Sequence, residues 1–153
     1  MMKTKIVKNY LYDGLGFPIE LTNVEMCFIE NDWHPRIDVQ KVADDVIKKL
    51  AIQETRLTGD QVRFIRSYFS MPLREFAEKV AHETHGAVQK WEKKGNKPTS
   101  MNSNTEHELR LYIIEMIHKK NQKSKSKFYD LYIATKRFFK SDYDDNSMAH
   151  GSI

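Results

Sequence analysis

The chain is poor in cysteine and in long apolar runs. Cys27 is its one cysteine, so no internal disulfide can form and a reducing compartment is expected. No run approaches the roughly 18 consecutive apolar residues that a membrane helix needs. The first residues, Met-Met-Lys-Thr-Lys, lack the apolar core of a secretory signal. We therefore expect a cytoplasmic protein with no membrane partner.

The sequence also lacks the usual groupings of catalytic residues. It shows no nucleophile beside a base, no cluster of metal ligands and no phosphate loop, which argues against an enzyme and predicts no cofactor. His82 and His85 could chelate a metal, but they straddle a predicted turn without further ligands, and the alternative is two solvated histidines. Gly14-x-Gly16 is typical of a hairpin, and Cys27 of a packed thiol in a strand.

Positive charge is present, and it is unevenly distributed. Residues 56–100 carry nine basic and five acidic side chains, and residues 121–140 carry six and one, whereas 1–55 and 141–153 are net acidic. A basic patch is the usual electrostatic signature of a protein that binds a phosphate backbone. The two basic blocks therefore favour nucleic acid as a partner, although many solvated surfaces are also basic.

Within the first 55 residues, the spacing of apolar residues changes from every second residue to the spacing of a helix. Asp13-Gly14 predicts a hairpin turn, and the alternation of apolar and polar residues from Phe17 onward predicts a small antiparallel sheet over residues 5–30, with Pro18 suited to an edge strand. Asp38 is a good N-cap for an amphipathic helix whose apolar stripe begins at Val39. We interpret residues 1–55 as a domain that contacts a partner.

Three short helices are predicted between Thr58 and Pro98. Thr58-Gly59-Asp60-Gln61 has the spacing of a capping box, Thr84 can cap another helix, and Gly95-Asn96-Lys97-Pro98 ends it. Three short helices joined by tight turns are typical of a helix-turn-helix. The alternative interpretation is a small bundle of three amphipathic helices with no DNA-binding role. The residues expected to form the core of the helix-turn-helix are Phe76, Ala77, Val88 and Trp91.

A further helix is predicted from Ser103 or Asn104 to about Lys120. Its apolar arc includes Leu111 and Ile114 and is wider than one packing surface requires, which predicts additional burial against a second subunit. Residues 56–120 would then form a DNA-binding and dimerisation domain. Residues 121–153 are expected to be a basic linker, a short helix over 128–140 and a disordered acidic tail. The predicted fold class is α+β.

The stretch from Leu73 to Glu92 resembles the lambda-repressor-like, or xenobiotic-response-element, helix-turn-helix family. It has Phe-Ala in one helix and Val-x-x-Trp-Glu after a small polar cap, with one residue more than the common pattern between Ala77 and Thr84. The resemblance implies a buried ion pair between Arg66 and Glu92. The resemblance also implies positions that contact DNA, and further candidates lie beside or after these positions in the sequence. Together they are Arg74, Thr84, His85, Gly86, Gln89, Lys90, Lys93, Lys94 and Lys97.

A wider resemblance links residues 10–118 to MqsA- and HigA-type antitoxins. It rests on Leu57-Thr58-Gly59, Phe64-Ile65-Arg66, Lys90-Trp91-Glu92 and the Pro98-Thr99-x-Met101 segment. In the MqsA-type antitoxins, two pairs of cysteines hold a zinc ion. Because one cysteine cannot build that site, we expect no metal here, with Phe17, Ile19, Trp33 and the stripe from Val39 supplying the core instead.

Two functions follow as expectations. The first is a sequence-specific DNA-binding transcriptional regulator, a homodimeric repressor that reads a palindromic operator in double-stranded DNA through helix Thr84–Lys93. The alternative is an antitoxin of a type II toxin-antitoxin pair, which would neutralise a co-encoded RNase toxin and repress its own operon. A small basic open reading frame beside the gene would favour the antitoxin.

Overall fold

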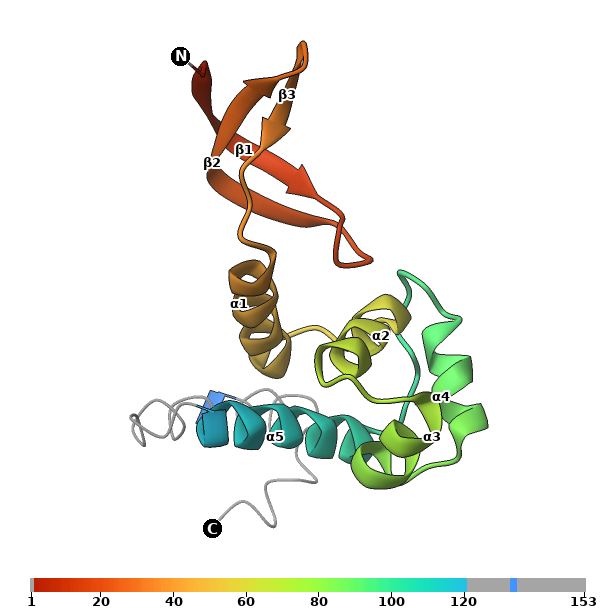
Figure 1. Cartoon of the computed structure of the whole chain (residues 1–153). Helices are drawn as coiled ribbons and strands as arrows, with labels where there is room; N and C mark the ends of the chain where they lie inside the picture. The colour runs from red at the N-terminus through yellow and green to blue at the C-terminus, as the bar shows by residue number, and fades with distance from the viewer. Residues whose placement is uncertain (1, 121–132, 135–153) are drawn as a thin grey trace. The chain divides into compact units, whose positions relative to one another are not determined.

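The computed structural model describes residues 2–120 and 133–134. An antiparallel sheet is followed by helices, so the predicted α+β class is confirmed (Figure 1). The elements are β1 (Thr4–Tyr12), β2 (Ile19–Ile29), β3 (Asp32–Pro35), α1 (Val39–Ile52), α2 (Gly59–Tyr68), α3 (Leu73–Phe76), the π-helical η1 (Ala77–Ala81), α4 (His85–Glu92) and α5 (Ser103–Lys120). The predicted linker, last helix and tail fall in 121–153, of which only Ile133 and Ala134 are described.

The chain divides into two compact units, and the boundary falls inside α1. The first unit ends at Asp45, and the second begins at Val46. Across the described residues, no helix is long and apolar enough to cross a membrane.

The sheet has the order β1-β2-β3, with Val7 opposite Val24 and Tyr12 opposite Ile19. The predicted turn is present, since the Gly16 amide donates to the Asp13 carbonyl at 3.1 Å. The expectation of an edge strand after Pro18 is wrong, because β2 lies between the other two strands. Its central position explains why Val24, Met26 and Cys27 are buried. Pro18 is tolerated because it precedes the first residue of β2.

Among the residues expected to form the core of the first unit, the expectation for Val39 is wrong. Trp33 lies half-buried in β3, where its ring packs on Phe28 with centroids 5.2 Å apart. Glu30 and Asn31 both have positive φ and make the tight turn that returns the chain as β3. Val39 is 50% exposed because it is the first residue of α1, and the buried stripe begins at Ala43.

Helix α1 begins where predicted, because the Asp38 carboxylate accepts a hydrogen bond from the Lys41 amide at 3.1 Å. Its stripe continues into the second unit through buried Val46, Ile47 and Leu50. A short segment then leads to α2, whose capping box is complete. Thr58 Oγ1 accepts from the Gln61 amide, and Gln61 Oε1 accepts from the Thr58 amide.

The extra residue between α3 and α4 is accommodated by a change of helix type. Only short helices were predicted between Thr58 and Pro98, and the structure adds a π-helical turn: α3 ends at Phe76 and the chain continues as η1. His82 then adopts a left-handed conformation at φ 53°, and the Glu83 amide donates to the Ala77 carbonyl at 2.9 Å. A π-turn places one more residue in a turn than an α-helix does, so Phe76, Ala77 and Val80 stay buried.

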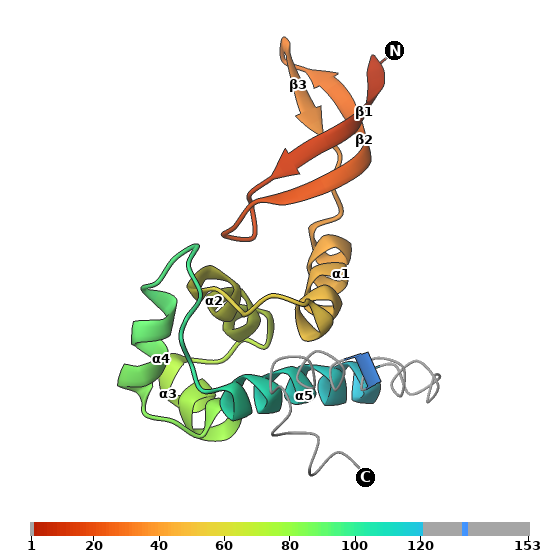
Figure 2. The same cartoon turned by 180° about the vertical axis from the view of Figure 1, so that it is seen from behind.

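Helices α2, α3 and α4 group together near the start of α5, as both views of the second unit show (Figure 2). Helix α5 has the predicted bounds, but its wide arc has another explanation. Ile114 is fully buried within this chain, so its burial needs no second subunit. Leu111, Tyr112 and Met116 are half-buried.

Candidate nucleic-acid interface

Helix α4 begins at a side-chain cap. Thr84 is extended, with φ −75° and ψ 154°, and its Oγ1 accepts a hydrogen bond from the Ala87 amide at 3.1 Å. The Thr84 hydroxyl hydrogen remains available, because the hydroxyl acts only as an acceptor in this bond. Thr84 is exposed, as is His85 in the first turn of the helix.

Helix α4 has one buried and one exposed face. Val88 and Trp91 are buried with 0% and 9% exposure, and Phe76 and Ala77 are also fully buried, so the four predicted core residues are confirmed. Five of the predicted DNA-contacting residues lie on the opposite face at helical spacing, and all are exposed except half-buried Gly86. This face comprises His85, Gly86, Gln89, Lys90 and Lys93.

A buried carboxylate fixes the angle between α2 and α4. Glu92 is 5% exposed and accepts two hydrogen bonds from Arg66, at 2.7 Å from Nε and 3.0 Å from Nη2. Hydrogen bonding to Glu92 raises the pKa of Arg66 and outweighs the lowering effect of burial, so the guanidinium stays charged. Arg66 also donates to the Met71 carbonyl at 3.1 Å, which holds the turn before α3. Arg63, which sequence reasoning did not identify, adds a third bond to Glu92 at 3.3 Å.

The segment after α4 is held against the start of α2. The Gly59 amide donates to the Lys97 carbonyl at 3.2 Å, and the Asp60 amide donates to the Gly95 carbonyl at 2.9 Å. A Cβ on Gly59 would lie 2.3 Å from the Trp91 carbonyl oxygen, so glycine is required there. The lysine-bearing turn is therefore fixed by backbone contacts.

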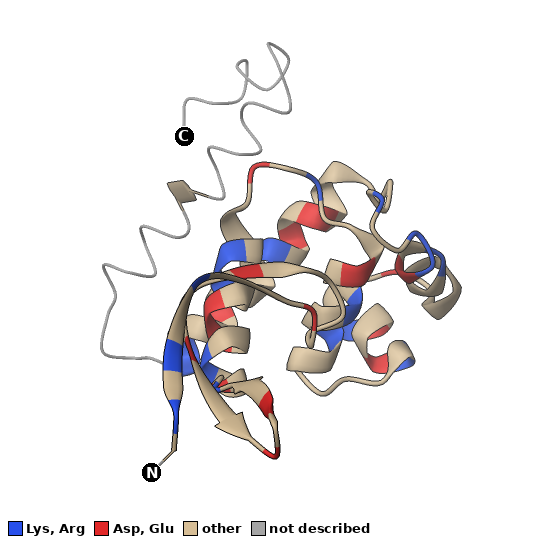
Figure 3. Cartoon of the chain, turned by 90° about the horizontal axis from the view of Figure 1, so that it is seen from above, with Lys and Arg blue, Asp and Glu red and all other residues tan. Residues whose placement is uncertain are grey.

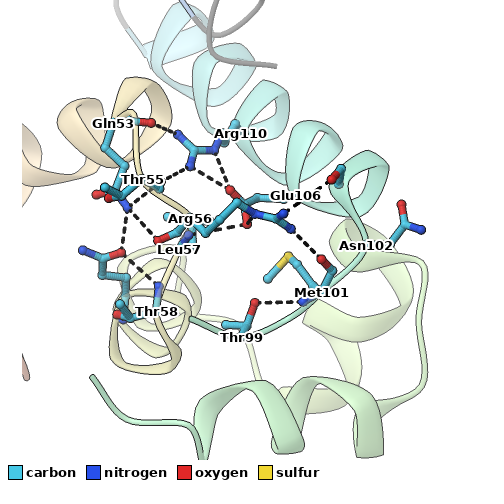
Figure 4. A network of polar contacts seen from close by, with 12 residues as sticks. Gln53, Thr55, Arg56, Leu57, Thr58, Thr99, Met101, Asn102, Glu106 and Arg110 are labelled. Carbon is cyan, nitrogen blue, oxygen red and sulfur yellow. Dashed lines mark hydrogen bonds and ion pairs between the residues drawn. The ribbon is translucent and has the colours of Figure 1, made fainter. Parts of the chain in front are cut away.

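A second buried carboxylate, Glu106, anchors α5 to the segment before α2 (Figure 4). Glu106 and Arg110 have fully buried side chains joined at 2.8 Å, and Arg56 Nε approaches the other oxygen of Glu106 at 2.9 Å. Arg110 also donates to the carbonyls of Leu50, Gln53 and Thr55, at 2.7 to 3.2 Å. These carbonyl dipoles help to offset the burial of the Arg110 guanidinium, while Arg56 stays about one-third exposed.

Sequence reasoning missed this cluster, although α5 carries a signal for it. Glu106 and Arg110 continue the buried stripe of Leu109, Ile113 and Ile117 at helical spacing, so their positions predict burial even though their charges suggest a solvated face. The Pro98-Thr99-x-Met101 segment also has a structural role here. Thr99 and Met101 are buried, and the Thr99 amide donates to the Leu57 carbonyl at 3.1 Å.

The remaining predicted contact residues are exposed cations on α3, on α4 and after it. Figure 3 marks the lysine and arginine positions along the chain in blue. Within residues 2–120, no carboxylate lies within ion-pair distance of these contact residues, whereas Arg63, Arg66 and Lys79 each have one. These side chains can therefore meet an external anion without losing an internal partner. They are Arg74, Lys90, Lys93, Lys94 and Lys97.

His82 and His85 are both exposed, at the end of η1 and at the start of α4. Among the residues that the structure describes, no group of three histidine, cysteine, aspartate or glutamate side chains is placed to hold a metal ion. The α4 face therefore offers hydrogen-bond donors and positive charge.

No protein-family model, no curated protein and no solved structure matches this chain.

Proposed function

We propose that the chain is a sequence-specific DNA-binding transcriptional regulator, a homodimeric cytoplasmic repressor that reads a palindromic operator through α4. The observation that carries the proposal is the exposed face of α4. His85, Gln89 and Lys90 project from a helix whose other face is fixed by Val88, Trp91 and Glu92. An α-helix fits the major groove of B-form DNA, where side-chain donors can distinguish base pairs.

The side chains of this face suit base edges. Lys90 can donate to guanine O6 and N7, and the Gln89 amide can pair with adenine N6 and N7. Gly86 lies one turn before Lys90, and a Cβ there would find only Thr84 Oγ1, at 3.9 Å. The absence of a side chain at Gly86 leaves room for a base pair to approach the helix backbone.

The surrounding groups suit phosphates. The Thr84 hydroxyl can donate to a phosphate oxygen, because its acceptor side is used by the Ala87 amide. Lys93, Lys94 and Lys97 follow on the turn held against α2, and Arg74 lies in the first turn of α3. Contacts of this kind position a protein on DNA and make its affinity depend on salt.

A gel shift with Lys90→Ala tests the assignment of α4. The probe is the tightest-binding duplex that the full chain recovers from a randomised pool. Loss of a base-reading lysine is expected to weaken binding about 10- to 100-fold, the range for one good base contact. Lys41→Ala is the matched control, since Lys41 is an exposed lysine on α1 paired with Asp45, and it should leave affinity unchanged. Unchanged affinity and sequence preference in Lys90→Ala would refute the role of α4.

The antitoxin function stays a prediction alongside this proposal. It is supported by the presence of a separate sheet-bearing unit, which could bind another protein. Co-expression with the product of a neighbouring toxic gene tests it: rescue of growth is expected, and growth inhibition that persists despite soluble expression would contradict it.

A further inference from the structure

The outer edge of β1 has no strand beside it in the described part of the chain. β1 is nine residues long and pairs on one side with β2 only. Long edge strands present a row of backbone donors and acceptors, and proteins usually protect them. The features of this edge indicate what could cover it.

The backbone groups that point outward can be assigned from one hydrogen bond. The Phe28 amide donates to the Lys3 carbonyl at 3.0 Å, and the register continues with Thr4 opposite Cys27. Because such pairs alternate along an antiparallel ladder, the odd-numbered residues of β1 bond to β2. The even-numbered residues, from Thr4 to Tyr12, therefore direct their amides and carbonyls outward.

Two large apolar side chains are exposed on β1. Ile6 is 70% exposed and Leu11 is 69% exposed, and they are the most exposed large apolar residues among those that the structure describes. Their neighbours on β2 are Glu25 and Glu20. β2 offers carboxylates rather than apolar surface opposite them, whereas a strand paired at the outer edge could place apolar side chains beside them.

Two of the lysines near this edge do not protect it. The Lys3 ammonium lies 5.8 Å from the Phe28 ring centroid, and the Lys5 ammonium lies 4.3 Å from that of Trp33. Both side chains are therefore drawn across the sheet toward β2 and β3. Lysines that shield an edge would instead extend beyond it.

A second copy of β1 complements this edge in one symmetric register. A twofold axis normal to the sheet requires one residue to face its own counterpart. With Asn9 on the axis, Val7 faces Leu11 of the second copy, Ile6 faces Tyr12, Lys8 faces Tyr10, and Lys5 faces Asp13. Each exposed apolar residue thus gains an apolar or aromatic neighbour.

The neighbouring registers are less complementary. Centring the axis on Lys8 brings two lysines together. Centring it on Val7 places Ile6 opposite Lys8, and centring it on Tyr10 places Val7 opposite Asp13. Like charges or mismatched neighbours across strands are unfavourable.

We propose that two copies of this chain pair through the outer edges of β1, antiparallel about a twofold axis at Asn9. The two sheets then form one continuous sheet. This interface replaces the α5 surface that the sequence suggested for the second subunit. The inference concerns assembly, and its test is read without DNA, so it can fail or succeed independently of the DNA-binding proposal.

Cysteine cross-linking of the full chain tests the register. In Asn9→Cys the two thiols face each other in a non-hydrogen-bonded pair, with Cα atoms about 4.5 Å apart, which a disulfide can span. In Lys8→Cys the two introduced cysteines are diagonal neighbours about 7–8 Å apart, which is too far for a disulfide. Mild oxidation should therefore yield a covalent dimer of Asn9→Cys much faster than of Lys8→Cys. The wild-type chain, with buried Cys27, gives the background. Equal rates in all three would overturn the proposal.

A second measurement addresses the affinity of the dimer. Leu11→Lys should raise the dimer dissociation constant about tenfold or more in analytical ultracentrifugation, because it affects both symmetric contacts with Val7. Val39→Lys changes another exposed apolar residue, on α1, and should leave the constant unchanged. A wild-type chain that stays monomeric, or a Leu11→Lys chain that dimerises as tightly as wild type, would contradict the pairing.

Discussion

Two glycines in the helical unit illustrate different reasons for lacking a side chain. Gly59 is required by packing, since its Cβ would meet the Trp91 carbonyl at 2.3 Å. At Gly86 a side chain would fit without a clash, because the nearest atom to an added Cβ would be Thr84 Oγ1 at 3.9 Å. A glycine inside a helix costs about 0.5–1 kcal/mol relative to alanine. At Gly86 this cost has no explanation in the described contacts, and the proposed approach of DNA supplies one.

Gly86→Ala should separate stability from function. The free energy of unfolding, measured in urea, is expected to rise by about 0.5–1 kcal/mol, because alanine reduces the conformational freedom of the unfolded chain. DNA affinity, measured by fluorescence anisotropy on the recovered duplex, is expected to fall about tenfold or more, because the added methyl group meets a base edge. A variant that is more stable and binds DNA as tightly as wild type would argue against close approach at this position.

At the scale of single elements, α5 contains two Glu-Lys/Arg pairs at the same i,i+4 spacing. Glu106 and Arg110 are fully buried, whereas the side chains of Glu115 and Lys119 are about 60% exposed. Only the buried pair connects α5 to Arg56 and to the backbone before α2. Its contribution should therefore far exceed that of the exposed pair.

Glu106→Gln is expected to destabilise the chain by about 3–5 kcal/mol, because it leaves the Arg110 guanidinium buried without an opposite charge. Glu115→Gln makes the same chemical change on the same helix and should cost less than about 1 kcal/mol. Urea unfolding followed by circular dichroism measures both. Similar losses for the two variants would show that burial does not set the strength of the Glu106 pair.

The elements differ in how well the sequence predicts them, and local signals account for the difference. Asp38, Thr58 and Thr84 carry side-chain oxygens that bond amides within three residues, so the starts of α1, α2 and α4 can be read from the chain. β3 is only four residues long and contains a proline, which gives a weak strand signal. The π-turn depends on fitting one extra residue between packed helices, which no local pattern reports.

In the candidate site too, only the features with a local sequence signal could be predicted. Val88 and Trp91 could be assigned to the core from their spacing, and the exposed face of α4 follows from them. The second cation on Glu92, Arg63, lies on α2 whereas Glu92 lies on α4, so the contact depends on tertiary packing. Glu106 was hidden because a charged residue is ordinarily solvent-exposed, and only its helical spacing marks it as buried.

In the molecule as a whole, we propose different tasks for the two units. The first unit carries the sheet, whose β1 edge has no neighbouring strand among residues 2–120, and the second carries α4 with its exposed donors and the exposed lysines after it. The proposed dimer would present two copies of α4 to DNA. A homodimer of this kind reads an inverted repeat, because the symmetry of the protein is matched by that of the site.

Selection from a randomised pool of DNA duplexes by the 153-residue chain tests sequence-specific binding by a twofold-symmetric dimer. We expect enrichment of an inverted repeat whose half-sites are centred about 10 base pairs, or a multiple of this, apart. The enriched duplex should bind at least about 10³-fold more tightly than the starting pool at physiological salt. Failure to enrich any shared sequence, with equal affinity for all duplexes, would contradict the account.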